Sequence, residues 1–158
     1  MLFDTHLHLI YPDRLTYPWL ENVKVLNKPS KYENYRKLAS RLGISNCLHM
    51  EVDVAENQIK DETALIEELM ILPQSPIKGI ISACRPEYTN FPEFLEWIHN
   101  NPNIKGLRRV LHVVPDEISK TSVFRNNIKR LTGTGLTFDL CVSSKQISLT
   151  YDIVDYCP

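Results

Sequence analysis

The feature that most constrains the fold is a regular alternation along the whole chain. Short apolar runs typical of strands are each followed by a segment in which apolar residues recur at helical spacing. This alternation is typical of βα units, whose strands form a parallel sheet. The expected strands cover residues 2–9, 45–54, 77–84, 104–113 and 136–142.

The segments between these strands carry the periodicity and the end signals of helices. The expected helices cover residues 32–42, 57–72, 92–99 and 122–131, and the last residues begin a fifth helix. Gly43 ends the first helix, Pro73 closes the second, and Ser122 is the expected cap of the fourth. We find no fixed repeat and no flexible linker, so the sequence predicts a single domain over residues 1–158.

The number of units indicates the fold class. Five strands and almost five helices in 158 residues project to eight units at about the 250 residues of a typical barrel. We therefore expect an α/β protein of the TIM (β/α)₈-barrel type, with about five of the eight βα units present and the chain truncated at its C-terminus. An open, doubly wound five-stranded sheet also fits this count. Against that alternative, no glycine-rich phosphate loop follows the first strand.

Charge and hydropathy exclude several classes of protein. The chain has 18 Lys and Arg against 19 Asp and Glu, a formal charge of -1, so nothing attracts it as a whole to nucleic acid or to an anionic membrane. No apolar run approaches the roughly 20 residues of a membrane span, and the N-terminus has no signal-peptide pattern. We expect a cytoplasmic protein with a small-molecule substrate. The four cysteines are far apart and form no Cys-x-x-Cys pair, which favours reduced thiols in the core.

The clearest chemical feature is the segment Asp-Thr-His-Leu-His at residues 4–8 of the first expected strand. Alternation along a strand predicts that Asp4, His6 and His8 point to one face. At the carboxyl end of a parallel strand, two such imidazoles can hold a metal ion or donate hydrogen bonds to a carbonyl oxygen. The alternative is a pair of polar residues that are satisfied at a strand end.

This segment resembles the Asp-x-His-x-His signature of the amidohydrolase superfamily, of the amidohydrolase-related (amidohydrolase 2) type. The segment Tyr-Pro-Trp-Leu at 17–20 looks like its sugar-lactone and 2-pyrone-4,6-dicarboxylate lactonase branch. Residues 47–51, 105–111 and 138–140 resemble the second, fourth and fifth strands of that branch. The resemblance therefore spans nearly the whole chain and corresponds to the N-terminal part of the family's barrel.

Two neighbouring arginines lie on the fourth expected strand, so only one of them can face the barrel interior. Arg108 shares parity with Gly106, which leaves room for a substrate, and a guanidinium can grip a carboxylate through paired donors. We predict that Arg108 is a catalytic and substrate-binding residue, although a structural ion pair is the alternative. Arg109 is expected to be structural or directed to solvent.

Further substrate contacts are expected from the second strand and from the loop after the first. His49, Glu51 and Asp53 share one face of the second strand and can line the cavity or simply be satisfied polar groups. Trp19 can wall the substrate pocket or pack in the core. His112, at the end of the fourth strand, is a weaker candidate.

The resemblance implies hydrolysis, in which an Asp on the last barrel strand deprotonates a water that attacks a lactone or ester carbonyl. His6, His8 and Arg108 would stabilise the developing oxyanion. The resemblance leaves the cofactor open between one divalent metal ion such as zinc, held by His6 and His8, and no metal. Arg in place of a bridging Lys or Glu on the fourth strand argues against a binuclear site.

The family's late-strand His and catalytic Asp would both lie beyond Pro158. We therefore expect the 158-residue chain alone to be inactive on lactones, with the rest supplied by a longer protein, a homo-oligomer or a complementing partner. Two alternatives stay open: a metal-dependent decarboxylase of the same superfamily, and a non-catalytic half-barrel that acts by association. The sequence does not name the substrate.

Overall fold

The computed structural model describes residues 2–157, in which parallel strands alternate with helices as the sequence predicts. Runs rich in Ile, Val and Leu form the strands because such residues pack well on a pleated, buried surface. The described strands are β1 (Leu2–Leu7), β2 (Ile44–Met50), β3 (Ile77–Ala83), β4 (Ile104–Val110) and β5 (Thr137–Cys141).

Helices follow each strand, and short 3₁₀ turns precede three of them. The described α-helices are α1 (Tyr32–Arg41), α2 (Ile59–Met70), α3 (Phe91–His99), α4 (Glu117–Lys120), α5 (Ser122–Lys129) and α6 (Ile147–Tyr156). The 3₁₀ turns are η1 (Pro18–Asn22), η2 (Glu56–Gln58) and η3 (Ser144–Gln146). None of the described helices combines the length and the apolar character of a membrane span.

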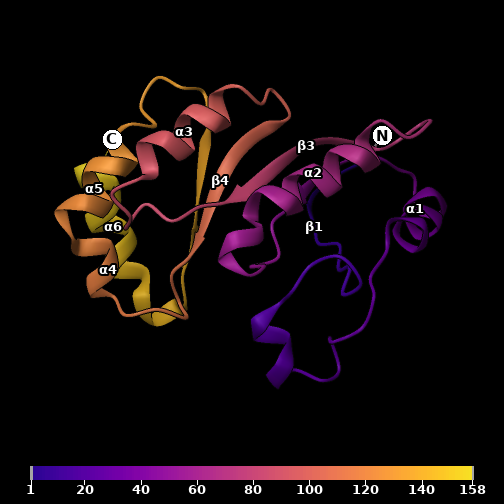
Figure 1. Cartoon of the computed structure of the whole chain (residues 1–158), viewed down its shortest axis with the longest axis horizontal. Coiled ribbons are helices and arrows are strands. Elements are labelled where there is room, and N and C mark those ends of the chain that lie inside the picture. The colour runs from indigo at the N-terminus through magenta and orange to yellow at the C-terminus, as the bar shows by residue number, and fades with distance from the viewer. Residues whose placement is uncertain (1, 158) are drawn as a thin grey trace. The chain divides into compact units, whose positions relative to one another are not determined.

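The chain forms two units, Met1–Ala83 and Cys84–Pro158. In the first unit β1 pairs in parallel with β2, and β2 with β3, while α1 packs against β2. Helix α2 packs against β3 (Figure 1). Apolar residues of these elements form its core. The prediction of one domain over residues 1–158 stays a prediction, and its two end residues lie outside the described part.

In the second unit β4 pairs in parallel with β5 without a register shift, from Gly106 opposite Thr137 to Val110 opposite Cys141. Its core includes Leu107 on β4 and Phe124 on α5, whose side chains are completely buried. This register fixes which side chains of the two strands share a face, because paired residues of neighbouring strands point the same way.

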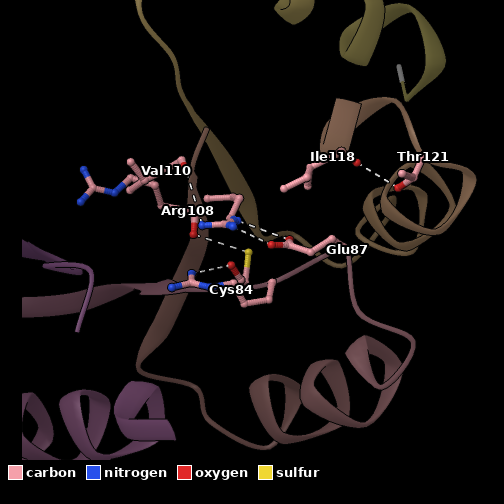
Figure 2. Close-up of polar contacts among 8 residues, drawn as sticks. Cys84, Glu87, Arg108, Val110, Ile118 and Thr121 are labelled. Carbon is pink, nitrogen blue, oxygen red and sulfur yellow. Dashed lines mark hydrogen bonds and ion pairs between the residues drawn. The ribbon is translucent and has the colours of Figure 1, made fainter. Parts of the chain in front are cut away.

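The structure differs from the sequence prediction mainly at the ends of elements. β1, β2 and β4 end two to four residues before the expected positions. Of the apolar residues that follow, Leu9, Val52, Val54 and Leu111 are buried beyond the strand ends and Val113 is exposed. The cap of α5 is Thr121, not Ser122, because the Thr121 hydroxyl oxygen accepts from the backbone N–H of Phe124 at 3.2 Å. The same hydroxyl donates to the carbonyl of Ile118 (Figure 2). The short helix α4 was not expected.

The thiol of Cys47 on β2 is buried and contacts Tyr35 of α1. Burial raises the pKa of Cys47 to about 11, although its hydrogen bond with Tyr35 acts in the opposite direction. The Tyr35 hydroxyl also donates to the Asp4 carboxylate at 3.0 Å. Cys47 is therefore a neutral core thiol at neutral pH, in agreement with the sequence analysis.

This raised pKa predicts an alkaline loss of stability. The thiol in the unfolded chain ionises near its ordinary pKa of about 8.5, before the buried one, so this stabilisation is present below that pH and is lost as the pH rises to about 11. At about 1.4 kcal/mol per pKa unit, we expect the free energy of unfolding to fall by about 3 kcal/mol over this range. Urea denaturation of the wild type and of Cys47→Ala at several pH values measures the effect. Identical pH slopes for the two proteins would contradict it.

Candidate active site

His6 and His8 converge at the carboxyl end of β1. Their Nε2 atoms lie 3.1 Å apart, and the rings meet edge to face with centroids 4.8 Å apart. His6 is exposed and His8 is partly buried. The structure therefore brings together the two residues whose spacing suggested a joint role.

The backbone of β2 sets the orientation of the second imidazole. Nδ1 of His8 lies 2.9 Å from the carbonyl oxygen of Met50. Because a carbonyl only accepts, Nδ1 carries the proton, and the neutral ring presents its Nε2 lone pair toward His6. In the His6–His8 hydrogen bond, Nε2–H of His6 is then the donor.

Asp4 does not join this pair, and the prediction that it shares their face is wrong. Between Asp4 and Leu7 the strand has a register irregularity: Asp4 is paired with Cys47 and Leu7 with His49, so three steps on β1 span two on β2. A bulge of this kind interrupts the alternation of side chains. Asp4 consequently faces Tyr35 of α1 and accepts from the backbone N–H of His6 at 3.0 Å.

The histidine pair fits part of a metal site. Two nitrogens bound to one tetrahedral zinc ion lie about 3.3 Å apart, since a Zn–N bond is about 2.0–2.1 Å. The observed 3.1 Å between the Nε2 atoms is close to this value, and the hydrogen bond from Nδ1 to a backbone carbonyl is the usual support of a metal-binding histidine. Within residues 2–157, however, no group of three or more His, Cys, Asp or Glu is placed to hold an ion.

The polar residues predicted on the second strand lie elsewhere. His49 is fully buried, and its pairing with Leu7 places it on the face of Leu7 rather than on that of the histidine pair. Glu51 follows the end of β2, and its Oε2 accepts from the N–H of Asp53 at 2.7 Å. Asp53 has a positive φ of 47°, so the extended alternation ends there. Substrate contacts by His49 and Glu51 stay predictions.

The segment Tyr17–Leu20 builds the loop that follows β1. The Tyr17 hydroxyl accepts from the N–H of Tyr11 at 2.9 Å, and burial raises the pKa of Tyr17 to about 12. Pro18 begins η1, where a missing N–H costs nothing. The indole Nε1–H of Trp19 donates to the carbonyl of Val52 at 2.8 Å. Its role as a wall of a substrate pocket stays a prediction.

The two arginines of β4 lie on opposite faces of the second unit. The register places Arg108 on one face with its partner Asp139 and with Cys141, both of β5, while Arg109 shares the other face with Leu107. Arg108 is 8% exposed, and its carbonyl accepts from the backbone N–H of Cys84 at 3.0 Å. The Sγ of Cys84 lies 3.5 Å from the same carbonyl oxygen (Figure 2). Its parity with Gly106 is as the sequence predicts, and its role in substrate binding stays a prediction.

Arg109 forms a buried ion pair with Glu87, in the segment before α3. Its NH2 and Nε atoms donate to the two carboxylate oxygens at 2.6 and 3.3 Å, drawn as dashed lines to Glu87 in Figure 2. The side chains are only 7% and 12% exposed. Asn127 of α5 holds the same segment by donating to the carbonyls of Pro86 and Tyr88 at 2.8 and 2.9 Å. The structural interpretation of Arg109 is therefore confirmed.

Sequence reasoning missed two carboxylates with defined roles, Glu62 and Glu87. Glu62 is 3% exposed, and its Oε1 accepts from the N–H of Val52 at 2.9 Å. The position of Glu62 indicated a buried role in the sequence, because it lies three residues after Ile59 and four before Ile66 on the apolar stripe of α2.

His112, the weaker candidate, is exposed, and its Nδ1 lies 3.7 Å from Sγ of Cys141.

Comparison with known proteins bears on the fold. No family model and no curated protein matches the sequence. Among solved structures, the chain is similar to amidohydrolase 2 from Bifidobacterium longum subsp. infantis, with a TM-score of 0.71 and 19% identity over 98% of this chain and 56% of that one. It is also similar to an amidohydrolase from Burkholderia multivorans in two crystal structures. The structure with bound zinc has a TM-score of 0.79 and 18% identity over 97% of this chain and 53% of that one. The structure with bound HEPES has a TM-score of 0.78 and 18% identity over 97% of this chain and 52% of that one.

The chain thus spans about half the length of these solved structures. Its five βα units match that half, which confirms the predicted (β/α)₈-barrel type. The likeness establishes that the chain has the fold of part of an amidohydrolase.

Proposed function

We propose that this chain belongs to a hydrolase of the amidohydrolase superfamily that opens a lactone or related cyclic ester of a sugar acid or dicarboxylate. The convergence of the His6 and His8 Nε2 atoms at the end of β1 is the observation that carries the proposal. The fold shared with amidohydrolases supports the hydrolase class, and the resemblance of residues 17–20 and 105–111 supports the lactonase branch. The predicted cytoplasmic location stays a prediction.

The two histidines would act on the carbonyl group of the substrate. Water adds to the acyl carbon, negative charge grows on the carbonyl oxygen, and the ring C–O bond then breaks to give a hydroxy acid. Donors that are fixed before the reaction stabilise such charge without reorganising. In this pair the donor is Nε2–H of His6, which would be shared between His8 and the growing charge. His8 is fixed by Met50 and holds the His6 ring in place.

A divalent ion is an additional expectation at this pair. When bound, it would polarise the carbonyl as a Lewis acid. The short Nε2–Nε2 distance supports zinc as a ligand of His6 and His8, and zinc is bound in one of the similar amidohydrolase structures. Among the described residues, His6 and His8 are the two proposed ligands of the ion. Without an ion, the same two histidines can act on the substrate carbonyl through hydrogen bonds alone.

We further propose that Arg108 grips a carboxylate of the substrate, so replacing it should affect acidic substrates selectively. Hydrogen bonds to charged groups contribute about 1.5–3 kcal/mol, so Arg108→Gln is expected to raise KM for carboxylate-bearing lactones roughly thirtyfold. KM for neutral lactones should change little, because these make no such contact. Lys105→Gln, an exposed change on the same strand, is the matched control. Equal effects on acidic and neutral lactones would contradict this role.

The direct test of the function is a substrate screen with the protein in the length in which the cell makes it. Neutral sugar lactones and lactones with free carboxylates are offered, with and without added zinc, and proton release is followed with a pH indicator. In ¹⁸O-labelled water we expect one label in the carboxylate of the product, because water attacks the acyl carbon. Release of CO₂ would indicate a decarboxylase instead, and no turnover of any lactone by the folded protein would contradict the proposal.

A further inference from the structure

The peptide units around Val52, in the loop that leaves β2, are held from two sides. The Val52 N–H donates to the buried carboxylate of Glu62 at 2.9 Å, and the Val52 carbonyl accepts from the indole N–H of Trp19 at 2.8 Å. The two partners come from α2 and η1, which lie far apart in the sequence. We infer that Trp19 and Glu62 are positioning residues for His8, which they serve by fixing the backbone that carries the Met50 carbonyl.

Only a short stretch of backbone separates His8's acceptor from the two hydrogen bonds that Glu62 and Trp19 make with Val52, which we call the clamp. Met50 precedes Val52 by two residues, and its carbonyl oxygen is the acceptor for Nδ1 of His8 at 2.9 Å. Between them, the N–H of Glu51 donates to the carbonyl of Ile81 on β3. The Glu51 N–H and the Met50 carbonyl belong to one peptide unit, so β3 holds one end of this unit and Glu62 and Trp19 hold the two units that follow it. We expect a displacement of the Val52 peptide units to tilt the acceptor that selects the tautomer of His8.

The clamp is built at some cost, which argues against an incidental contact. Glu62 is a carboxylate on the apolar stripe of a helix, where Ile or Leu would otherwise lie, and burying such a group is unfavourable unless its hydrogen bonds are made. Asp53 has a positive φ, which is uncommon for a residue other than glycine. A loop held in this conformation needs specific partners.

Other contacts tie the same loop to the segment that follows β1. The N–H of Ala55 donates to the carbonyl of Thr16 at 2.8 Å, and the N–H of Thr16 donates to Oε1 of Gln58 at 2.8 Å. Trp19 is three residues from Thr16, so the indole is itself held in place. The loops after β1 and β2 thus form one hydrogen-bonded layer beside the histidine pair.

This inference rests on the proposed function in one respect, that His8 binds a metal ion or orients the His6 donor at the site. Outer partners of a metal-binding histidine typically change metal affinity tenfold to a hundredfold when removed. Trp19 and Glu62 act one step farther out, so the expected effect is at the lower end, about tenfold.

The test compares Trp19→Phe and Glu62→Leu with the wild type in the whole protein. Two-bond ¹H–¹⁵N NMR of the histidine rings reports the tautomer of His8, and Co²⁺ titration followed by visible absorption reports affinity. The wild type should show the Nδ1–H tautomer of His8. Both variants should show a mixture of tautomers and a Co²⁺ affinity about tenfold weaker.

Controls separate positioning from general destabilisation. Glu62→Gln keeps an oxygen that accepts from Val52 and should restore the wild-type tautomer, while Trp97→Phe on α3 makes the same chemical change away from the site. If both clamp variants fold, by circular dichroism, with the wild-type tautomer and Co²⁺ affinity, the inference is overturned. If the wild type binds no Co²⁺, the metal part of the proposed function fails, and the tautomer comparison alone decides the inference.

Discussion

Replacing Glu87 by Ala is expected to lower the free energy of unfolding by about 3–5 kcal/mol, among the largest effects of any single substitution in this chain. Glu87 and Arg109 form a doubly hydrogen-bonded ion pair with side chains only 12% and 7% exposed. Removing the carboxylate leaves the guanidinium buried without its counter-charge. Urea denaturation followed by circular dichroism and tryptophan fluorescence measures the loss.

The chain contains a matched control for this prediction. Arg14 and Glu68 form a similar two-point ion pair, but their side chains are 45% and 57% exposed. Exposed pairs contribute at most about 1 kcal/mol, so Glu68→Ala should change stability little. The same carboxylate deletion is thus made once in the interior and once at the surface.

A double substitution tests the physical reason. If the cost of Glu87→Ala comes from the uncompensated charge of Arg109, replacing both residues by Met should recover most of the lost stability. Equal small losses for Glu87→Ala and Glu68→Ala would contradict the prediction. A double variant as unstable as the single one would instead indicate that the packing of the segment before α3, held by Asn127, is at fault.

The order of elements was predictable because hydrophobic periodicity depends on burial, which the local sequence encodes. The carboxyl ends of the strands were less predictable. Val52 and Val54 continue the apolar pattern of β2, but they are buried in the loop that follows this strand. The spacing cannot tell a paired strand residue from a buried loop residue. This is the region in which the candidate site lies.

The parts of the candidate site that depend on residue type and spacing could be predicted from the sequence. The parts that depend on backbone pairing and main-chain hydrogen bonds could not. The His-x-His spacing brings His6 and His8 together, as expected from alternation. The bulge that turns Asp4 toward α1 depends on the pairing register, and the acceptor of His8 is a main-chain carbonyl that every residue possesses. Neither carries a signature in the sequence.

Glu62 and Glu87, the two carboxylates that sequence reasoning missed, differ in whether the sequence pattern indicates them. Glu62 could have been found, because a charged residue on the apolar stripe of a helix requires a buried partner. Glu87 could not, since its partner is 22 residues away and its segment has no periodicity. A search for charged residues on predicted apolar faces would have found the first and missed the second.

Replacing either histidine of the pair should reduce turnover much more than it reduces stability. Removing one preorganised donor from an oxyanion site typically costs about 10²–10³ in kcat. We expect losses of this size for His6→Ala, which removes the donor, and for His8→Ala, which removes the ring that orients it, measured on the best substrate of the lactone screen. Because the Nε2 atoms contact each other and only His8 is anchored to Met50, the two act as a unit, so the double variant should be little worse than either single one. His99→Ala, at the exposed end of α3, should retain wild-type kcat. Losses that multiply in the double variant would mean that the two imidazoles act independently, and unchanged turnover in both single variants would remove the pair from the mechanism.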